Sequence, residues 1–244
     1  MKNNIMIILF LGTIISSFTR VYPITILCLL AMVYMAKKQR GTYYRKDSVG
    51  IMNLNNTYDF DKFPEEYVVV NVATTGLDYT TARIIEVGII KYSGGVVDQF
   101  SQLVNPEISI PAEATKITGI TTNMVKKKPT IKVVIPEVFR RINGQIVVGY
   151  NVSFDTKFLN IAFGRADLLM EEMVQIDVLE LVKHTVPSED ITDSKLETVQ
   201  SYFGILGNTD DPRINTNCDV INQVFIRCMN IRNNMELNSH SDQV

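Results

Sequence analysis

The chain of 244 residues contains no tryptophan, only two histidines and only three cysteines. Three cysteines are an odd number, and their spacing matches no disulfide framework, so a reducing compartment is the simpler interpretation. Histidine is the side chain that most often acts as a general base near neutral pH. Any catalytic histidine must therefore be His184 or His240.

An excess of positive charge is also absent, because the formal net charge is −2. This argues against tight, nonspecific binding to nucleic acid through a broad basic surface, but it leaves room for a local groove. The sequence contains no internal repeat and no low-complexity tract. These features favour one folded domain with appendages over a repeat protein.

Charged residues are missing from two apolar runs near the N-terminus, residues 3–19 and 21–36, which Arg20 separates. A helix of about 16 residues is about 24 Å long, somewhat shorter than the ~30 Å hydrocarbon core of a bilayer. Two arrangements fit this length. One is a helical hairpin that turns near Pro23, and the other is a single span near residues 18–36.

Basic residues follow the second run directly, at Lys37, Lys38, Arg40, Arg45 and Lys46. By the positive-inside rule they place the rest of the chain in the cytoplasm. A cleaved signal peptide is the alternative, but only one lysine precedes the apolar run and no Ala-x-Ala site follows it. We therefore expect residues 1–36 to be a transmembrane segment in the lipid bilayer, and residues 37–65 to be a polar linker.

Residues 66–232 alternate between strand-like and helix-like patterns, which is typical of an α/β domain. Residues 233–244 are polar, and we expect a disordered tail. The expected strands are Val68–Ala73, Arg83–Tyr92, Val96–Val104, Gln145–Tyr150 and Gln175–Val178. The expected helices are Pro111–Ile117, Thr121–Lys127, Ile131–Ile142, Ser153–Phe163, Lys195–Phe203 and Cys218–Ile231, and a further helix follows Gln175–Val178. Thr121 is expected to cap the second helix, and Pro136 to interrupt or bend the third.

Residues 68–77 have the sequence Val-Val-Val-Asn-Val-Ala-Thr-Thr-Gly-Leu and resemble the first motif of the DEDDh family of 3′–5′ exonucleases. In that family an apolar strand continues as Asp-x-Glu-Thr-Thr-Gly-Leu. Asn71 occupies the Asp position here and Ala73 occupies the Glu position. The rest of the motif is retained as Thr74, Thr75, Gly76 and Leu77.

Four further segments match the family in order and in spacing. They are residues 117–121, residues 148–159 (the second motif, usually Gly-His-Asn-x-x-Phe-Asp), residues 194–199 and residues 215–220 (the third motif). The family includes the proofreading subunit of bacterial replicases. The resemblance extends over residues 66–230 and implies a ribonuclease H-like fold, with a mixed central sheet of about five strands flanked by helices.

Members of this family bind two divalent ions, Mg²⁺ or Mn²⁺, which activate water and stabilise the leaving oxygen of the phosphate. Four carboxylates offset the repulsion between the ions, which is about 16 kcal/mol at an effective dielectric constant of about 20. A histidine is the general base. The family's five catalytic positions fall here at Asn71, Ala73, Asp155, Ile214 and Asp219.

Three of these five positions carry a substitution, so the resemblance implies a degenerate catalytic site. Asn71 offers one neutral oxygen and Ala73 offers no ligand. Asp155 and Asp219 are left to hold at most one weakly bound Mg²⁺ or Mn²⁺. The loss of a general base alone lowers a rate by roughly 10²–10⁴-fold, and Tyr150, which replaces a histidine of the second motif, is a poor base near pH 7.

Each retained acid also has a structural interpretation. Asp155 could anchor its helix, and Asp219 could stabilise the start of the last helix through the helix dipole. Glu86 and Asp177 lie on neighbouring strands and could substitute for a lost ligand. For nucleic acid, the resemblance assigns contacts to Thr74, Thr75, Gly76, Leu77, Asn151 and Phe154.

The sequence therefore predicts a membrane-anchored, exonuclease-like domain in the cytoplasm that binds a nucleic-acid end or a nucleotide and is catalytically impaired. One alternative is an active, metal-dependent 3′–5′ exonuclease with an altered metal site. The other is a protein-interaction module at the membrane with an unknown protein partner. The retained first-motif loop and Asn151, Phe154 and Asp155 favour ligand binding over the interaction module.

Overall fold

The computed structural model describes residues 63–170, 173–206 and 214–241, with the side chains of the last helix described over residues 217–233. No helix within these ranges is long and apolar enough to cross a bilayer. The predicted transmembrane segment, residues 1–36, and nearly all of the predicted linker lie outside the described residues.

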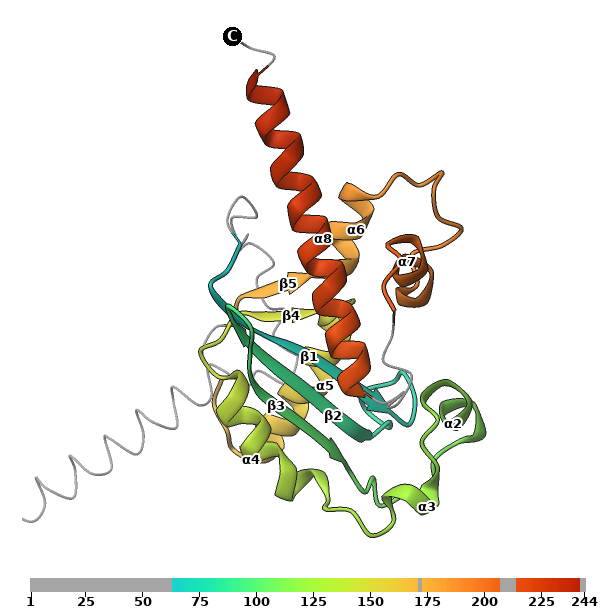
Figure 1. Ribbon diagram of the computed structural model, residues 1–244. Helices are drawn as coiled ribbons and strands as arrows, with labels where there is room; N and C mark the ends of the chain where they lie inside the picture. The colour runs from blue at the N-terminus through green and yellow to red at the C-terminus, as the bar shows by residue number, and fades with distance from the viewer. Residues whose placement is uncertain (1–62, 171–172, 207–213, 242–244) are drawn as a thin grey trace, which may run out of the picture. The chain divides into compact units, whose positions relative to one another are not determined.

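A five-stranded sheet forms the centre of the domain, with the strand order β3-β2-β1-β4-β5 (Figure 1). The strands are β1 (Glu66–Thr74), β2 (Ile84–Ser93), β3 (Val96–Leu103), β4 (Val147–Gly149) and β5 (Gln175–Asp177). β1 pairs antiparallel with β2, and β2 with β3, whereas β4 runs parallel to β1 and to β5. The sheet is therefore mixed, as predicted.

Seven described helices surround or follow the strands: α2 (Ala112–Thr118), α3 (Thr122–Val125), α4 (Ile131–Ile142), α5 (Val152–Arg165), α6 (Val178–Thr185), α7 (Leu196–Tyr202) and α8 (Ile214–Ser241). The helix α8 crosses one face of the sheet, next to α6 and α7 (Figure 1). The helices α4 and α5 pack against each other on the opposite face, where α4 contacts β2 and α5 contacts β1. The expected α/β architecture with helices on both faces is confirmed.

Alternation along β1 explains why both faces of the sheet are covered. Successive side chains of a strand point to opposite faces. Tyr67 and Val69 pack in a cluster with α6 and α8, including Val182, Val224 and Phe225. The intervening side chain, Val68, is also fully buried, which is expected for a central strand with helices on either side.

The turn between β2 and β3 follows the sequence signal Ser93-Gly94-Gly95. Gly94 has a positive φ of 65°, a conformation that glycine adopts without a steric penalty. The amide of Ser93 donates a hydrogen bond to the carbonyl oxygen of Gly95 at 2.9 Å. The return strand then runs antiparallel from Val96, as expected.

Three elements differ in detail from the sequence predictions. The helix α4 is continuous through Pro136 rather than interrupted there. Thr121 stands at the N-cap position of α3, but its hydroxyl makes no capping hydrogen bond. The helix α8 begins at Ile214 and continues to Ser241, beyond residue 232, because no glycine or proline interrupts the chain over this stretch.

Candidate functional site

The loop after β1 is held together by its own side chains. The hydroxyl of Thr74 donates to the carbonyl oxygen of Gly76 at 2.7 Å. The hydroxyl of Thr75 accepts from the amide of Arg83 at 2.9 Å, and the amide of Thr75 donates to the carbonyl oxygen of Arg83 at 2.8 Å. These bonds fix the loop and leave Leu77 at its tip, with 80% of its surface exposed.

The second motif forms the turn from β4 into α5. A Cβ added to Gly149 would lie 2.9 Å from Cγ2 of Val152, so only glycine fits this close approach. Asn151 occupies the N-cap position of α5 with a positive φ of 58°, is exposed and makes no capping hydrogen bond through its side chain. Phe154 is half-buried, and its ring centroid lies 5.1 Å from that of Phe158.

Asp155 joins this helix to the first motif. It is 3% exposed, and its Oδ1 accepts a hydrogen bond from the amide of Val72 at 2.7 Å. The first-motif strand and the start of α5 therefore meet at one end of the sheet, which brings the loop Thr74–Leu77, Asn151 and Phe154 to the same end.

Burial raises the pKa of Asp155 to about 8. The hydrogen bond from Val72 opposes this rise, and the nearby charge of Asp177 adds to it. Without a bound cation the carboxyl is therefore mostly protonated at neutral pH. A divalent ion would have to displace this proton in order to bind.

Asn71 and Ala73 lie on β1, where the family has its first two acids. Asn71 is half-buried and pairs with Gly88 of β2. The side chain of Ala73 packs against an apolar cluster between the sheet and α2 and α3. That cluster consists of Ile85, Leu103, Ile110, Ala114, Ile120 and Val125.

Glu86 lies directly across the β1–β2 ladder from Ala73, so the two side chains are on the same face of the sheet. Glu86 is 3% exposed, and the hydroxyl of Ser101 on β3 donates to its Oε1 at 3.4 Å. This carboxylate therefore stands next to the position where the family has its glutamate, but on the neighbouring strand.

Asp219 lies in the second turn of α8 and is exposed. Its Oδ2 accepts a hydrogen bond from Nε2 of Gln223 at 2.8 Å. Ile214 is the first residue of α8, and its side chain lies outside the described part of the chain.

Cys218 is a site residue that the sequence did not single out. Burial raises the pKa of its thiol, and the nearby carboxyls of Asp155, Glu86 and Asp219 raise it further. The thiol is fully buried, and the three acids that raise its pKa come from α5, β2 and α8. Its position immediately before Asp219, in the third motif, is the sequence signal that would have identified it.

The remaining candidate bases and ligands have other contacts. The ring of His184 is within 2.7 Å of the Glu180 carbonyl oxygen in its own helix, α6. The hydroxyl of Tyr150 donates to the Ser194 carbonyl oxygen at 2.6 Å, and burial raises its pKa, so Tyr150 is a poor base here as expected. Asp177 caps α6 through the amide of Leu179 and accepts from the amide of Asn151.

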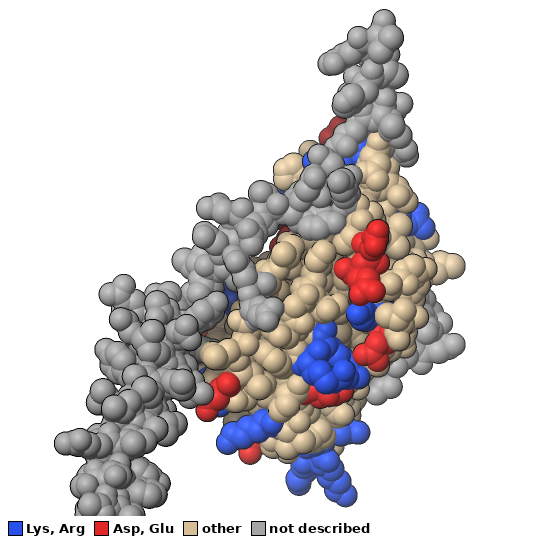
Figure 2. Space-filling model, turned by 90° about the vertical axis from the view of Figure 1, so that its left-hand side faces the viewer, with Lys and Arg blue, Asp and Glu red and all other residues tan. Residues whose placement is uncertain are grey.

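Within the described ranges, no three His, Cys, Asp or Glu side chains are grouped so that they could hold a metal ion. Figure 2 shows one face of the molecule, on which lysine and arginine residues form separate groups near acidic residues. No continuous basic stripe crosses that face (Figure 2). Any nucleic-acid contact there is accordingly local.

Several known proteins are similar to this chain over the exonuclease region. Residues 68–210, more than half of the chain, match the family model described as exonuclease. The PolC-type DNA polymerase III of Caldanaerobacter subterraneus is 36% identical over 141 residues, 57% of this chain and 10% of the relative. The PolC-type enzyme of Bacillus subtilis is 36% identical over 145 residues, 58% of this chain and 10% of the relative. The chain thus spans about a tenth of the length of these relatives.

Solved structures show the same fold. The crystal structure of Escherichia coli exonuclease I in complex with a dT13 oligonucleotide is 14% identical and has a TM-score of 0.59. The similarity covers 72% of this chain and 43% of exonuclease I. The match to the family model, together with the motifs at both ends of the domain, shows that the chain belongs to the DEDDh-type 3′–5′ exonuclease family.

Proposed function

We propose that this domain binds a nucleic-acid end or a nucleotide and is impaired in hydrolysing it. The observation that carries the proposal is the state of Asp155. This retained family acid is buried, and its Oδ1 accepts a hydrogen bond from the amide of Val72. One carboxyl oxygen is therefore a structural acceptor for the first-motif strand.

The other positions support the same conclusion. Two divalent ions need several carboxylates to offset their repulsion. Here Ala73 packs in an apolar cluster, and the exposed Asp219 is hydrogen-bonded to Gln223. These residues do not fit a two-ion site, so we derive no catalytic step through metal ions.

Ligand binding is supported by the part of the site that is intact. The loop Thr74–Leu77 keeps its internal hydrogen bonds, and Leu77 is exposed at its tip. Exonuclease I, which has the same fold, was solved with an oligonucleotide. A preformed loop loses little conformational freedom when it binds, which favours binding even without catalysis.

The test compares the full-length chain, purified in mild detergent, with the triple variant Asn71→Asp, Ala73→Glu, Ile214→His. Degradation of single-stranded DNA and RNA is measured with Mn²⁺, and thermal stabilisation by nucleoside monophosphates is measured in parallel. We expect stabilisation of both proteins, and degradation by the original chain at least about 100-fold slower than by the triple variant, because a missing general base alone has an effect of that size.

Two results would contradict the proposal. Equal degradation by both proteins would establish an active enzyme with an altered site. If neither protein degrades nucleic acid and nucleotides stabilise neither of them, although both show a normal unfolding transition, the result would favour a protein-interaction module. The Arg140→Gln variant changes an exposed residue of α4 that pairs with Glu137 and is not a family position, so it controls for nonspecific effects of substitution.

We also propose that residues 1–36 anchor this domain to a membrane, with the domain in the cytoplasm. The two uncharged apolar runs and the basic residues that follow them support this. Membrane fractions extracted at alkaline pH should retain the full-length chain and release a chain that lacks residues 1–36. Recovery of the full-length chain in the soluble fraction would contradict an anchor.

A further inference from the structure

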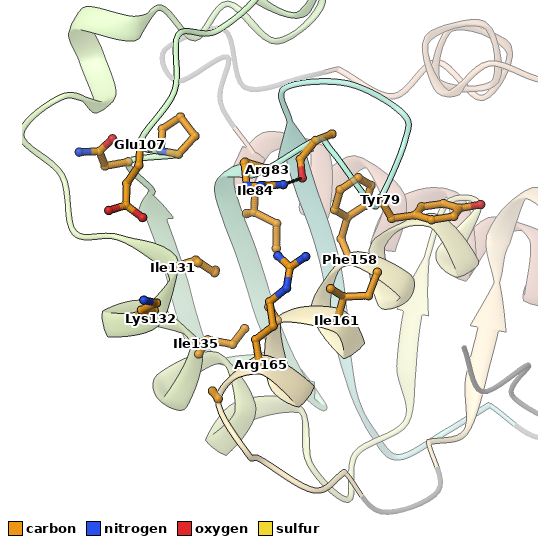
Figure 3. Close-up of a pocket in the computed structure, with 15 residues that line it drawn as sticks. Tyr79, Arg83, Ile84, Glu107, Ile131, Lys132, Ile135, Phe158, Ile161 and Arg165 are labelled. Carbon is orange, nitrogen blue, oxygen red and sulfur yellow. Dashed lines mark hydrogen bonds between the residues drawn. The ribbon is translucent and has the colours of Figure 1, made fainter. Parts of the chain in front are cut away.

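A cavity of about 200 Å³ lies on the α4–α5 side of the sheet, apart from the family positions. Its walls come from the β1–β2 connection, the start of β2, the segment after β3, and the helices α4 and α5 (Figure 3). It contains none of the residues assigned above to catalysis, metal binding or nucleic-acid contact. Its chemistry can therefore be judged separately from theirs.

The inner wall of this cavity is apolar and rigidly packed. Ile84, Ile135, Phe158 and Ala162 line it, and each is buried. The ring of Tyr79 stands edge-on to that of Phe158, with the centroids 5.9 Å apart and the planes at 74°. Figure 3 shows Tyr79 and Phe158 on one side of the cavity and Ile131 and Ile135 on the other. These walls are suited to an apolar group.

Three cations and one carboxylate line the same cavity, namely Arg83, Lys132 and Arg165 with Glu107. The lining thus has an excess of two positive charges. Among the described residues, Lys132 and Arg165 have no ion pair and no hydrogen-bond partner. Figure 3 shows Arg165 extending from the end of α5 toward Ile84, into the middle of the lining residues.

Arg83 is held in place without being neutralised. Its Nη1 donates to the carbonyl oxygens of Thr81 at 2.7 Å and Ala82 at 3.0 Å. Neutral carbonyl oxygens orient a guanidinium but leave its net charge unpaired. Unpaired cations next to an apolar wall are complementary to a ligand that is both apolar and anionic.

The volume limits the size of that ligand. Pockets for drug-sized molecules measure about 300–1,000 Å³, whereas a cavity of about 150 Å³ lined by apolar side chains admits benzene. We propose that this cavity binds a small organic anion with a single apolar ring. The ring lies between Phe158 and Ile135, and its carboxylate or phosphate pairs with Arg165 and Arg83.

The test titrates the full-length chain in detergent with phenyl phosphate, benzoate and the uncharged benzyl alcohol, with affinity measured by ligand-observed NMR. We expect at least one of the two anions to bind about ten-fold or more tightly than benzyl alcohol. The anion that binds more tightly shows whether the cavity prefers a phosphate or a carboxylate. Equal binding of all three probes, or no binding of any, would overturn the proposal.

Two variants locate the binding. Arg165→Gln removes an exposed charge and should weaken the binding of the anions about ten-fold while leaving that of benzyl alcohol unchanged. Arg140→Gln is the matched control, because Arg140 lies in the last turn of α4, pairs with Glu137 and does not line the cavity. Anion affinity that is unaffected by Arg165→Gln, or equally weakened by Arg140→Gln, would also overturn the proposal. These outcomes do not depend on nucleic-acid binding, so the two proposals fail independently.

Discussion

At the scale of single residues, Asp155 has the strongest influence on what the site can do. Its ordinary pKa of about 3.9 is raised to about 8 by burial, with a further contribution from Asp177. Between these pH values the folded protein keeps a proton that the unfolded chain releases. The free energy of unfolding therefore falls as the pH rises through this range.

Asp155→Asn should remove this pH dependence. Asparagine still offers an oxygen to the Val72 amide but cannot ionise, so the variant gains stability relative to the original chain as the pH rises. The gain is at most about 1.4 kcal/mol per pH unit. Urea unfolding of both proteins between about pH 5 and about pH 8, with EDTA present, measures it. A stability difference that stays constant with pH would show that Asp155 is ionised in the folded protein.

Two tyrosines that face each other across the β1–β2 ladder should respond differently to loss of their hydroxyls. Tyr67 donates to Oδ1 of Asn222 at 2.6 Å in a buried hydrogen bond between β1 and α8. Tyr67→Phe leaves this oxygen unsatisfied and should lower the free energy of unfolding by about 1–3 kcal/mol.

Tyr92→Phe is the matched control. The Tyr92 hydroxyl is buried and has no partner at hydrogen-bonding distance in the described part of the chain, so it interacts only weakly with the nearby Asp219 carboxylate. Burial, and to a smaller extent Asp219, raises its pKa. Removal of the Tyr92 hydroxyl should lower the free energy of unfolding, measured with urea, clearly less than removal of the Tyr67 hydroxyl. Equal losses would mean that the stability comes from ring packing, since the two rings stack with centroids 5.3 Å apart.

At the scale of elements, the helix α4 contains a proline in its interior, a position where proline disfavours helix. Pro136 lies in the middle of this helix and is exposed. It lacks the amide that would donate to the carbonyl oxygen of Lys132, and a proline in a helix interior costs about 3 kcal/mol relative to alanine. The buried positions Val134, Ile135 and Val138 on either side keep the helix against the sheet.

Pro136→Ala should therefore raise the free energy of unfolding by about 1–3 kcal/mol. Because Pro136 is exposed, little packing is lost, and the gain should appear as a higher urea midpoint with an unchanged slope. Val133→Ala in the same helix, also exposed, should change stability by less than about 0.7 kcal/mol. A loss of stability in Pro136→Ala would show that the proline is needed for the local path of the helix.

Elements whose hydrophobic period is clear could be predicted from the sequence. The bounds of α4 agree with the prediction at both ends, and Ser93-Gly94-Gly95 marked the β2–β3 turn. The beginning and end of α8 could not be predicted in the same way. Residues 232–241 are polar and lack an apolar stripe, so only the absence of a stop signal favours helix there.

The candidate site was predictable in position but not in its hydrogen bonding. In the structure, Asn71 and Ala73 on β1 lie at the same end of the sheet as Asp155, whose carboxyl accepts from the amide of Val72 between them. The sequence could not show that Asp155 accepts from the Val72 amide, 83 positions away. The place of Cys218 among three acids also depends on how α8 lies on the sheet, which no local pattern specifies.

At the scale of the whole molecule, charge limits how nucleic acid can be held. The formal net charge is −2, so the molecule as a whole has no excess of positive charge to attract phosphates. Binding at a strand end through the loop Thr74–Leu77 neutralises few phosphates. Proteins with many phosphate contacts lose affinity steeply with salt, whereas a few contacts give a shallow dependence.

We therefore expect the affinity for a single-stranded oligonucleotide to fall only about ten-fold between about 50 and 200 mM salt, the loss that about two phosphate contacts produce at a slope of about −0.7 per contact. Fluorescence anisotropy with the full-length chain in EDTA measures this slope. The three exposed lysines after α3, Lys126, Lys127 and Lys128, provide the control. Their joint replacement by glutamine should leave the slope unchanged if the strand end is held at the first-motif loop. A steep slope that this replacement flattens would instead place the nucleic acid on the lysines and contradict binding at the family site.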